Sequence, residues 1–172
     1  TGVQTCALPI SQRLPHRLLE GRALRVQRHV KALALAGKEF NFSLKDALKK
    51  GPVVLYFFPK AFTGLCTAEL CAIRDEKADF VSDDVVTFGI SCDSDAALKV
   101  FAEQENYDYD LLSDYWPHGG VARSFGAFLE DKGFATRATF VIDKEGVVRW
   151  KVVNGPGDTR SNDDYREALA AL

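Results

Sequence analysis

Residues 53–66 read V-V-L-Y-F-F-P-K-A-F-T-G-L-C, an apolar run followed by a proline, a short loop and a cysteine. Its first six residues are apolar throughout, which is typical of a strand that is covered on both faces. Pro59 has no backbone N–H and cannot extend a central strand, so the strand is expected to end there. A short loop with Thr63 and Gly64 follows, and a helix is expected over 67–80. Cys66 is therefore predicted at the start of a helix that follows a buried strand.

A cysteine at the start of a helix can act as a nucleophile. Backbone N–H groups in the first turn of a helix have no intrahelical partners, and the helix dipole is positive there. Both effects favour the thiolate, which is the reactive form of the side chain. The alternative is a small buried apolar residue, which is the commoner role of a lone cysteine. The placement of Cys66 alone leaves these two interpretations equally open.

The rest of the chain alternates strand patterns with helix patterns. Further strands are expected over 38–44, 85–91, 107–112, 138–142 and 147–153. Further helices are expected over 44–49, 96–104, 117–125 and 165–172. Pro117 is expected to begin the third of these helices, and the expected caps of the others are Ser43, then Asp93 or Ser94, then Asn162 or Asp163. Strands that alternate with helices and end in a hairpin and a helix predict an α/β fold.

Three motifs stand in order along the chain. Residues 59–66 fit the pattern P-x-x-x-T-x-x-C, residues 112–119 read L-S-D-Y-W-P-H-G, and residues 137–143 read R-A-T-F-V-I-D. Together they resemble the peroxiredoxins, a family of thiol peroxidases. The first resembles the active-site signature of that family, and the other two resemble segments that these enzymes place beside the reactive cysteine. The residues of the first two motifs are most similar to those of the one-cysteine alkyl hydroperoxide reductase E type. The resemblance runs from about Ala34 to the C-terminus, and it implies a thioredoxin-like fold with a mixed central β-sheet flanked by helices.

The resemblance also implies a role for each residue of the site. The Cys66 thiolate would attack a hydroperoxide and become a sulfenic acid. Thr63 would orient the peroxide, and Pro59 would shield the sulfur from bulk solvent. Arg137 would supply a fixed positive charge beside the sulfur and the peroxide oxygens. Glu69 either orients Arg137 or complements the helix dipole, and the sequence leaves both open.

Cys71 departs from the one-cysteine pattern. The spacing C-x-x-x-x-C resembles the bacterioferritin-comigratory-protein or Q type, in which a second cysteine resolves the sulfenic acid. Residues five apart in a helix have Cα atoms about 8–9 Å apart, whereas a disulfide usually needs less than about 7 Å. Resolution of Cys66 by Cys71 therefore requires the first helical turns to unwind, and a Cys71 that faces the core is the alternative. Cys92 is expected to be a small core residue.

The partners expected from the resemblance are hydroperoxide substrates and a thiol reductant. The reductant is either a thioredoxin-like protein or a low-molecular-weight thiol, and a homodimer is expected. Trp116 is expected to form a wall near the pocket or a subunit contact. No cofactor is expected, and four cysteines without a C-x-x-C do not form a zinc site. The alternatives are a thiol–disulfide redox-sensing module with little peroxidase turnover and a domain with purely structural cysteines.

The composition and charge of the chain argue against a membrane span and against nucleic acid as a partner. A chain of 172 residues with 47% hydrophobic side chains is enough for one domain. No apolar run approaches the ~18–20 residues of a membrane span. Residues 1–32 hold six basic side chains and one acidic, so residues 33–172 hold 16 basic and 23 acidic. An acidic body is poorly suited to nucleic acid, whose phosphates require clustered cations.

Residues 1–32 are expected to be a non-native or frameshifted segment, and residues 33–172 the peroxiredoxin domain. The sequence contains no methionine, and residues 1–10, T-G-V-Q-T-C-A-L-P-I, resemble the translation of a sequencing-library adapter. Residues 11–31 resemble nothing in the family. The native N-terminus is therefore expected to be missing, with any signal peptide, and the cytoplasm is the default location.

Overall fold

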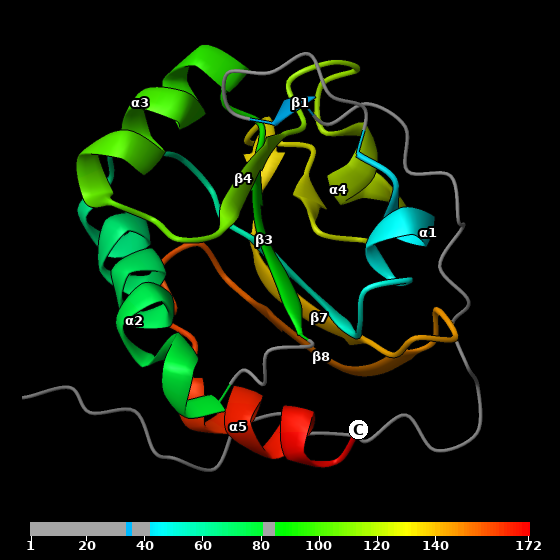
Figure 1. The fold of residues 1–172 in the computed structure, drawn as a ribbon. Helices are drawn as coiled ribbons and strands as arrows, with labels where there is room; N and C mark the ends of the chain where they lie inside the picture. The colour runs from blue at the N-terminus through cyan, green and yellow to red at the C-terminus, as the bar shows by residue number, and fades with distance from the viewer. Residues whose placement is uncertain (1–33, 36–41, 81–84) are drawn as a thin grey trace, which may run out of the picture.

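The computed structural model describes residues 34–35, 42–80 and 85–172, which build an α/β fold around one mixed sheet (Figure 1). The six strands of this sheet lie in the order β1-β4-β3-β2-β7-β8. They are β1 (Ala34–Leu35), β4 (Asp110–Ser113), β3 (Val86–Ser91), β2 (Val53–Phe57), β7 (Arg137–Ile142) and β8 (Val148–Asn154). The helices are α1 (Leu44–Ala47), α2 (Gly64–Phe80), α3 (Asp95–Glu105), α4 (Gly120–Ser124) and α5 (Asn162–Ala170). The α/β class and the mixed sheet flanked by helices are confirmed.

Strand β2 lies inside the sheet and is buried along its whole length, as its unbroken apolar sequence predicts. Successive side chains of a strand point to opposite faces, so β2 contributes to two cores. Val53, Leu55 and Phe57 pack in the core beneath α1 and α4. Val54 and Tyr56 pack in the core beneath α2, α3 and α5. These helices lie on the opposite side of the sheet from α1 and α4 (Figure 1).

The strand directions bring distant segments to one edge of the sheet. Strand β2 is parallel to β3, and β3 is parallel to β4, so all three strands end at the same edge. Strand β7 is antiparallel to β2, with Phe57 opposite Ala138, so β7 begins where β2 ends. Ligand sites of α/β sheets usually lie at the carboxyl ends of the parallel strands. The loop after β2 and the first residue of β7 therefore meet at the edge where a site is expected.

Helix α2 begins three residues earlier than the predicted start at residue 67, which changes the setting of Cys66. The N–H of Thr67 donates to the carbonyl of Thr63 at 2.9 Å, so the first helical turn already closes around Cys66. Cys66 thus lies inside the first turn of the helix. That turn is where backbone N–H groups lack intrahelical partners.

Two other helix starts differ from the prediction. Pro117 does not begin α4; the helix begins at Gly120, and the Asp114 carboxylate caps it by accepting the N–H groups of Val121 and Ala122 at 3.0 and 2.8 Å. Helix α5 begins at Asn162, after Ser161 and not after Asn162 or Asp163. The cap of α4 is Asp114, which follows β4, so the residues next to the helix in the sequence do not indicate where the helix begins.

The remaining predictions fall into three groups. The caps Ser43 and Ser94 and the hairpin between β7 and β8 are confirmed. The short hairpin of β5 (Phe128–Leu129) and β6 (Phe134–Ala135) was not predicted, and β4 begins at Asp110, three residues after the predicted start. The first predicted strand falls mainly on residues 38–41, which lie outside the described residues.

Residues 1–32 lie outside the described residues as well, so the proposed domain boundary stays a prediction. Within the described ranges, no helix is long and apolar enough to cross a membrane.

Candidate active site

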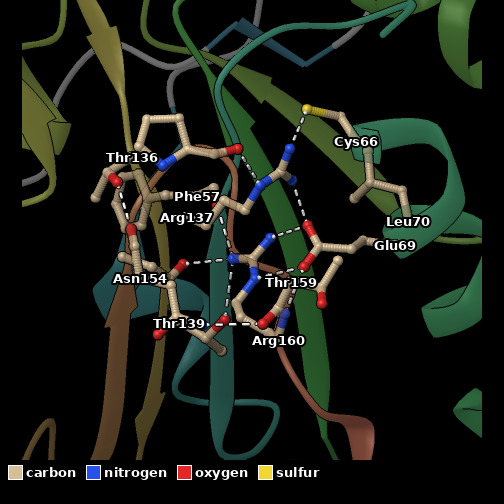
Figure 2. A network of polar contacts seen from close by, with 12 residues as sticks. Phe57, Cys66, Glu69, Leu70, Thr136, Arg137, Thr139, Asn154, Thr159 and Arg160 are labelled. Atoms are coloured by element: carbon tan, nitrogen blue, oxygen red, sulfur yellow. Dashed lines mark hydrogen bonds and ion pairs between the residues drawn. The ribbon is translucent and has the colours of Figure 1, made fainter. Parts of the chain in front are cut away.

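Cys66 lies buried at the beginning of α2, with only 1% of its surface exposed. Helix α2 turns its apolar side to the sheet, and Leu70 and Ile73 pack in the same core as Cys66. The Cys66 side chain points from this helix toward the start of β7, where a guanidinium group lies (Figure 2). The sulfur is therefore buried beside this guanidinium group, where a charge interacts with it more strongly than it would in water.

Arg137 is the first residue of β7, and its guanidinium group is held on three sides. Its Nε donates to the Pro156 carbonyl at 2.7 Å, and one terminal nitrogen donates to the Glu69 carboxylate. The other terminal nitrogen lies 3.4 Å from Cys66 Sγ (Figure 2). Arg137 is 2% exposed, although an isolated arginine in a sequence is usually a surface residue.

Glu69 lies three residues after Cys66 on α2 and is itself 8% exposed. Besides Arg137, its carboxylate accepts the backbone N–H of Arg160 at 2.8 Å and a terminal guanidinium N–H of Arg160 at 3.0 Å. Burial acts to raise the pKa of Glu69, but the hydrogen bonds and positive charges of Arg160 and Arg137 outweigh it and hold this pKa below its usual value. Glu69 is therefore an ionised link between two arginines.

Arg160 is a central residue of the site, and sequence reasoning missed it. It lies in the loop before α5, yet its guanidinium is buried, 3.4 Å above the Tyr56 ring. One terminal nitrogen donates to the carbonyls of Phe57 and Ala138 at 2.8 and 3.1 Å, which ties the loop to β2 and β7 (Figure 2). No motif marks Arg160, since it stands in a polar stretch that reads as an exposed loop.

The charges in this cluster do not balance. Two guanidinium groups face one carboxylate, so Arg137, Arg160 and Glu69 together carry one excess positive charge in a buried place. Buried charge is costly unless it is paired. Arg137 contacts Cys66 Sγ from within this cluster. The cluster therefore places a fixed positive charge beside the sulfur.

The other predicted site residues divide between the loop before α2 and the surface. Pro59 is buried two residues after the end of β2. Thr63 is exposed and donates its hydroxyl to the Lys60 carbonyl at 3.0 Å, which leaves its oxygen lone pairs free to accept. Trp116 is 76% exposed in the turn between β4 and α4, outside the buried cluster.

Cys71 is half-buried and faces away from the arginine cluster. Its Sγ lies 3.7 Å from a carboxylate oxygen of Glu105 and 4.0 Å from the Tyr107 hydroxyl, at the end of α3. Cys66 and Cys71 are both free thiols. In the folded helix the two sulfurs therefore contact different residues: Cys66 contacts Arg137, and Cys71 lies beside Glu105 and Tyr107.

Cys92 follows β3 and is expected to resist alkylation in the native protein. Burial and the nearby Asp114 charge raise the pKa of Cys92 to about 12, so at pH 8 only about one molecule in 10⁴ carries the thiolate. Peptide mapping after iodoacetamide treatment at pH 8 should find Cys92 unmodified and the half-buried Cys71 modified. Unfolding in urea is the control, because it should expose both thiols equally. Equal labelling of Cys92 and Cys71 in the folded protein would contradict this placement.

Comparison with known proteins places the chain in one family. Residues 26–151 match the sequence model of the AhpC/TSA family. Alkyl hydroperoxide reductase E of Mycobacterium tuberculosis is 42% identical over 120 residues, which are 70% of this chain and 78% of that protein. The chloroplastic 2-Cys peroxiredoxin BAS1 of Hordeum vulgare is 34% identical over 149 residues, 82% of this chain and 70% of that protein.

Solved structures agree with the sequence comparison. Enterococcus faecalis AhpC has a TM-score of 0.75 at 27% identity and covers 87% of this chain and 92% of its own. Peroxidoxin BcpB from Mycobacterium tuberculosis has a TM-score of 0.70 at 31% identity and covers 86% of this chain and 97% of its own. With the family match over residues 26–151, these likenesses show that the chain belongs to the AhpC/TSA family of peroxiredoxins.

Proposed function

We propose that Cys66 is the nucleophile with which this thiol-dependent peroxidase reduces hydroperoxides, including hydrogen peroxide and organic hydroperoxides. Relatives named alkyl hydroperoxide reductase E and 2-Cys peroxiredoxin support the reaction class. One observation carries the choice of residue. The Arg137 guanidinium lies 3.4 Å from Cys66 Sγ, in a buried cluster that is one negative charge short of neutral.

The proposed reaction is an in-line substitution at a peroxide oxygen. The thiolate lone pair of Cys66 forms the S–O bond while the O–O bond breaks, so the sulfur is oxidised and the peroxide is reduced. The leaving oxygen departs as an alkoxide or hydroxide and takes up a proton, which gives an alcohol or water. Arg137 stabilises the negative charge that moves from sulfur to the leaving oxygen. Thr63 accepts a hydrogen bond from the peroxide, and Pro59 keeps bulk water from the sulfur.

Rapid mixing of the reduced protein with hydrogen peroxide tests this proposal. The tryptophan fluorescence should change at a second-order rate that is orders of magnitude above that of free cysteine. A sulfenic-acid reagent added during the reaction should mark the Cys66 peptide. A rate equal to that of free cysteine would favour a redox-sensing module or a domain with structural cysteines. Marking of a different peptide would overturn the choice of Cys66.

Cys71 is the proposed resolving residue. Its thiol would attack the Cys66 sulfenic sulfur, so that the S–S bond forms, the S–O bond breaks and water leaves. Because Cys71 faces α3 in the folded helix, the first turns of α2 must open for the two sulfurs to meet. The start of α2 is suited to opening, since Thr63 and Gly64 are exposed and there is open space where a Cβ on Gly64 would point.

One equivalent of peroxide is expected to give two kinetic phases, a fast oxidation of Cys66 and a slower disulfide formation. The second phase is slower because opening the helix costs a few kcal/mol, the low end of subglobal opening energies. Cys71→Ser should keep the first phase, lose the second and overoxidise at high peroxide. Peptide mapping of the wild-type product should place the disulfide between Cys66 and Cys71. A stable sulfenic acid that is recycled equally well without Cys71 would show a one-cysteine route.

The proposed partners follow from the same chemistry. The oxidised enzyme requires a thiol reductant, either a thioredoxin-like protein or a low-molecular-weight thiol. A homodimer is proposed from the family likeness. The exposed ring of Trp116 supports its assignment to a subunit contact or to a wall at the entrance of the site. Residues 33–172 are the proposed peroxidase domain.

A further inference from the structure

We infer that Asp93 is a positioning residue for the peroxide reaction. Its carboxylate holds the loop of residues 59–63 between β2 and α2, and thereby sets where the Thr63 hydroxyl stands relative to Cys66. The inference rests on the proposed function, in which Thr63 orients the peroxide in front of the sulfur.

The Asp93 carboxylate spans two segments that are far apart in the sequence. Its Oδ2 accepts the backbone N–H of Ala61 at 2.8 Å and the hydroxyl of Ser91 at 2.7 Å. The Asp93 carbonyl accepts the Ser113 hydroxyl at 2.6 Å. Ser91 and Ser113 are buried at the ends of the parallel strands β3 and β4. Asp93 is thus anchored to two central strands, and from there it reaches the loop that follows a third.

The loop needs such an anchor because its backbone is strained. Phe62 has a φ of 58°, in the left-handed region that a bulky residue rarely adopts. A conformation of this kind persists only when the surrounding structure holds it. Before Phe62, the N–H of Ala61 donates to Asp93. After Phe62, the Thr63 carbonyl accepts the N–H of Thr67 in α2. The Phe62 ring also packs against Phe101 of α3, with ring centroids 4.9 Å apart.

Loss of the Asp93 carboxylate removes the hydrogen bond that ties Ala61, two residues before Thr63, to the ends of β3 and β4. The buried Ala61 then keeps an N–H without its partner, which favours a rearrangement of the loop. Once the φ angle of Phe62 relaxes, the backbone enters Thr63 from a different direction. Displacement of a positioning group by about 1 Å can cost a reaction about 10²-fold in rate. The thiol of Cys66 itself, held by Arg137 and α2, keeps its surroundings.

Asp93→Ala and Asp93→Asn test the inference by two rates measured on each protein. The first is the second-order rate of Cys66 with hydrogen peroxide, and the second is its rate of alkylation by iodoacetamide, which does not need Thr63. For Asp93→Ala we expect the ratio of the peroxide rate to the alkylation rate to fall about 10–100-fold. Asp93→Asn should keep the ratio within about 3-fold, because an amide oxygen can still accept both hydrogen bonds.

Ser94→Ala is the matched control. Ser94 is the next residue, and its side chain caps α3 by accepting the N–H of Ala97. The control should lower the melting temperature and leave the ratio of the two rates unchanged. Ser91→Ala loosens the Asp93 carboxylate without removing it, so it should lower the same ratio less than Asp93→Ala, and it serves if Asp93→Ala does not fold.

Three results would overturn the inference: an unchanged ratio in both Asp93→Ala and Ser91→Ala, an equal fall in Ser94→Ala, or an Asp93→Asn ratio as low as that of Asp93→Ala. A wild-type protein that reacts no faster than free cysteine would instead overturn the proposed function, and this is seen before any variant is made.

Discussion

Cys66→Ser is expected to abolish peroxide reduction, lowering the rate with hydrogen peroxide by at least about 10³-fold. A serine hydroxyl is not ionised near neutral pH, so the variant offers no anionic nucleophile to the peroxide oxygen. The substitution is nearly isosteric, and the packing of α2 against Leu70 and Ile73 should survive. The measurement is peroxide consumption in rapid mixing, with circular dichroism to show that the variant is folded.

Cys92→Ser is the control for the loss of a thiol as such. Because the pKa of Cys92 is raised to about 12, its thiol takes no part in the reaction at neutral pH, and this variant should react like the wild type. If Cys66→Ser keeps a rapid reaction that Cys92→Ser or Cys71→Ser removes, the nucleophile has been assigned to the wrong cysteine.

Glu69→Gln is expected to lower the free energy of unfolding by about 3–5 kcal/mol at pH 7, the usual cost of removing one partner from a buried ion pair. The carboxylate is the negative group between Arg137 and Arg160, and the neutral amide leaves both guanidinium groups facing each other. Peroxide reduction should fall as well, because Arg137 loses the contact that orients it beside Cys66. Urea unfolding followed by circular dichroism measures the first effect, and rapid mixing measures the second.

The same residue predicts an acid dependence of stability. The pKa of Glu69 in the folded protein lies below its ordinary value of 4.5, so around that pH the unfolded chain binds more protons than the folded one. The stabilisation is complete above pH 4.5 and is lost as the pH falls through the lower, folded pKa. The stability of Glu69→Gln should therefore fall less steeply than that of the wild type below pH 4.5.

Glu130→Gln supplies the contrast for Glu69→Gln. Glu130 is an exposed carboxylate that pairs with the partly exposed Arg123, and solvent screens such pairs. Its removal should change stability far less than Glu69→Gln does. Equal effects of the two substitutions would show that the buried cluster contributes no more than a surface pair.

Much of the fold could be predicted from the sequence because it follows from local patterns. Residues 53–58 are apolar without a break, and β2 is buried on both faces. Asp143 to Gly146 mark a hairpin, and β7 and β8 form it. Alternation of Val148 and Trp150 with charged neighbours predicts that both side chains lie on one face of β8. Both are buried, but the pairing with β7 skips Arg149, so Val148 packs in the core with α1 and α4 and Trp150 in the core on the other face. Each of these features depends on residues that are neighbours in the chain.

Local patterns led to Cys66 at the start of a helix, whereas the roles of Thr63 and Pro59 in the loop before it came from the family signature. Arg137 and Glu69 required the family motifs, since spacing along the chain does not show that an arginine 71 residues from Cys66 contacts its sulfur. The same patterns failed at the starts of α4 and α5. Helix α4 is capped by Asp114 from the end of β4, which no residue beside the helix announces.

Most strands and helices of the main sheet follow from local sequence patterns, and so does the prediction of Cys66 at the start of a helix. The surroundings of Cys66 depend on contacts between distant segments, which only the folded chain brings together. Arg160 reaches Glu69 across 91 residues, and Asp93 reaches Ala61 across 32. In the sequence Arg160 looks like a polar loop residue that faces water, and Asp93 looks like one of two candidate helix caps. They are buried or partly buried because the parallel strands end at one edge, where the loops must pair each other's charges and N–H groups once water is excluded.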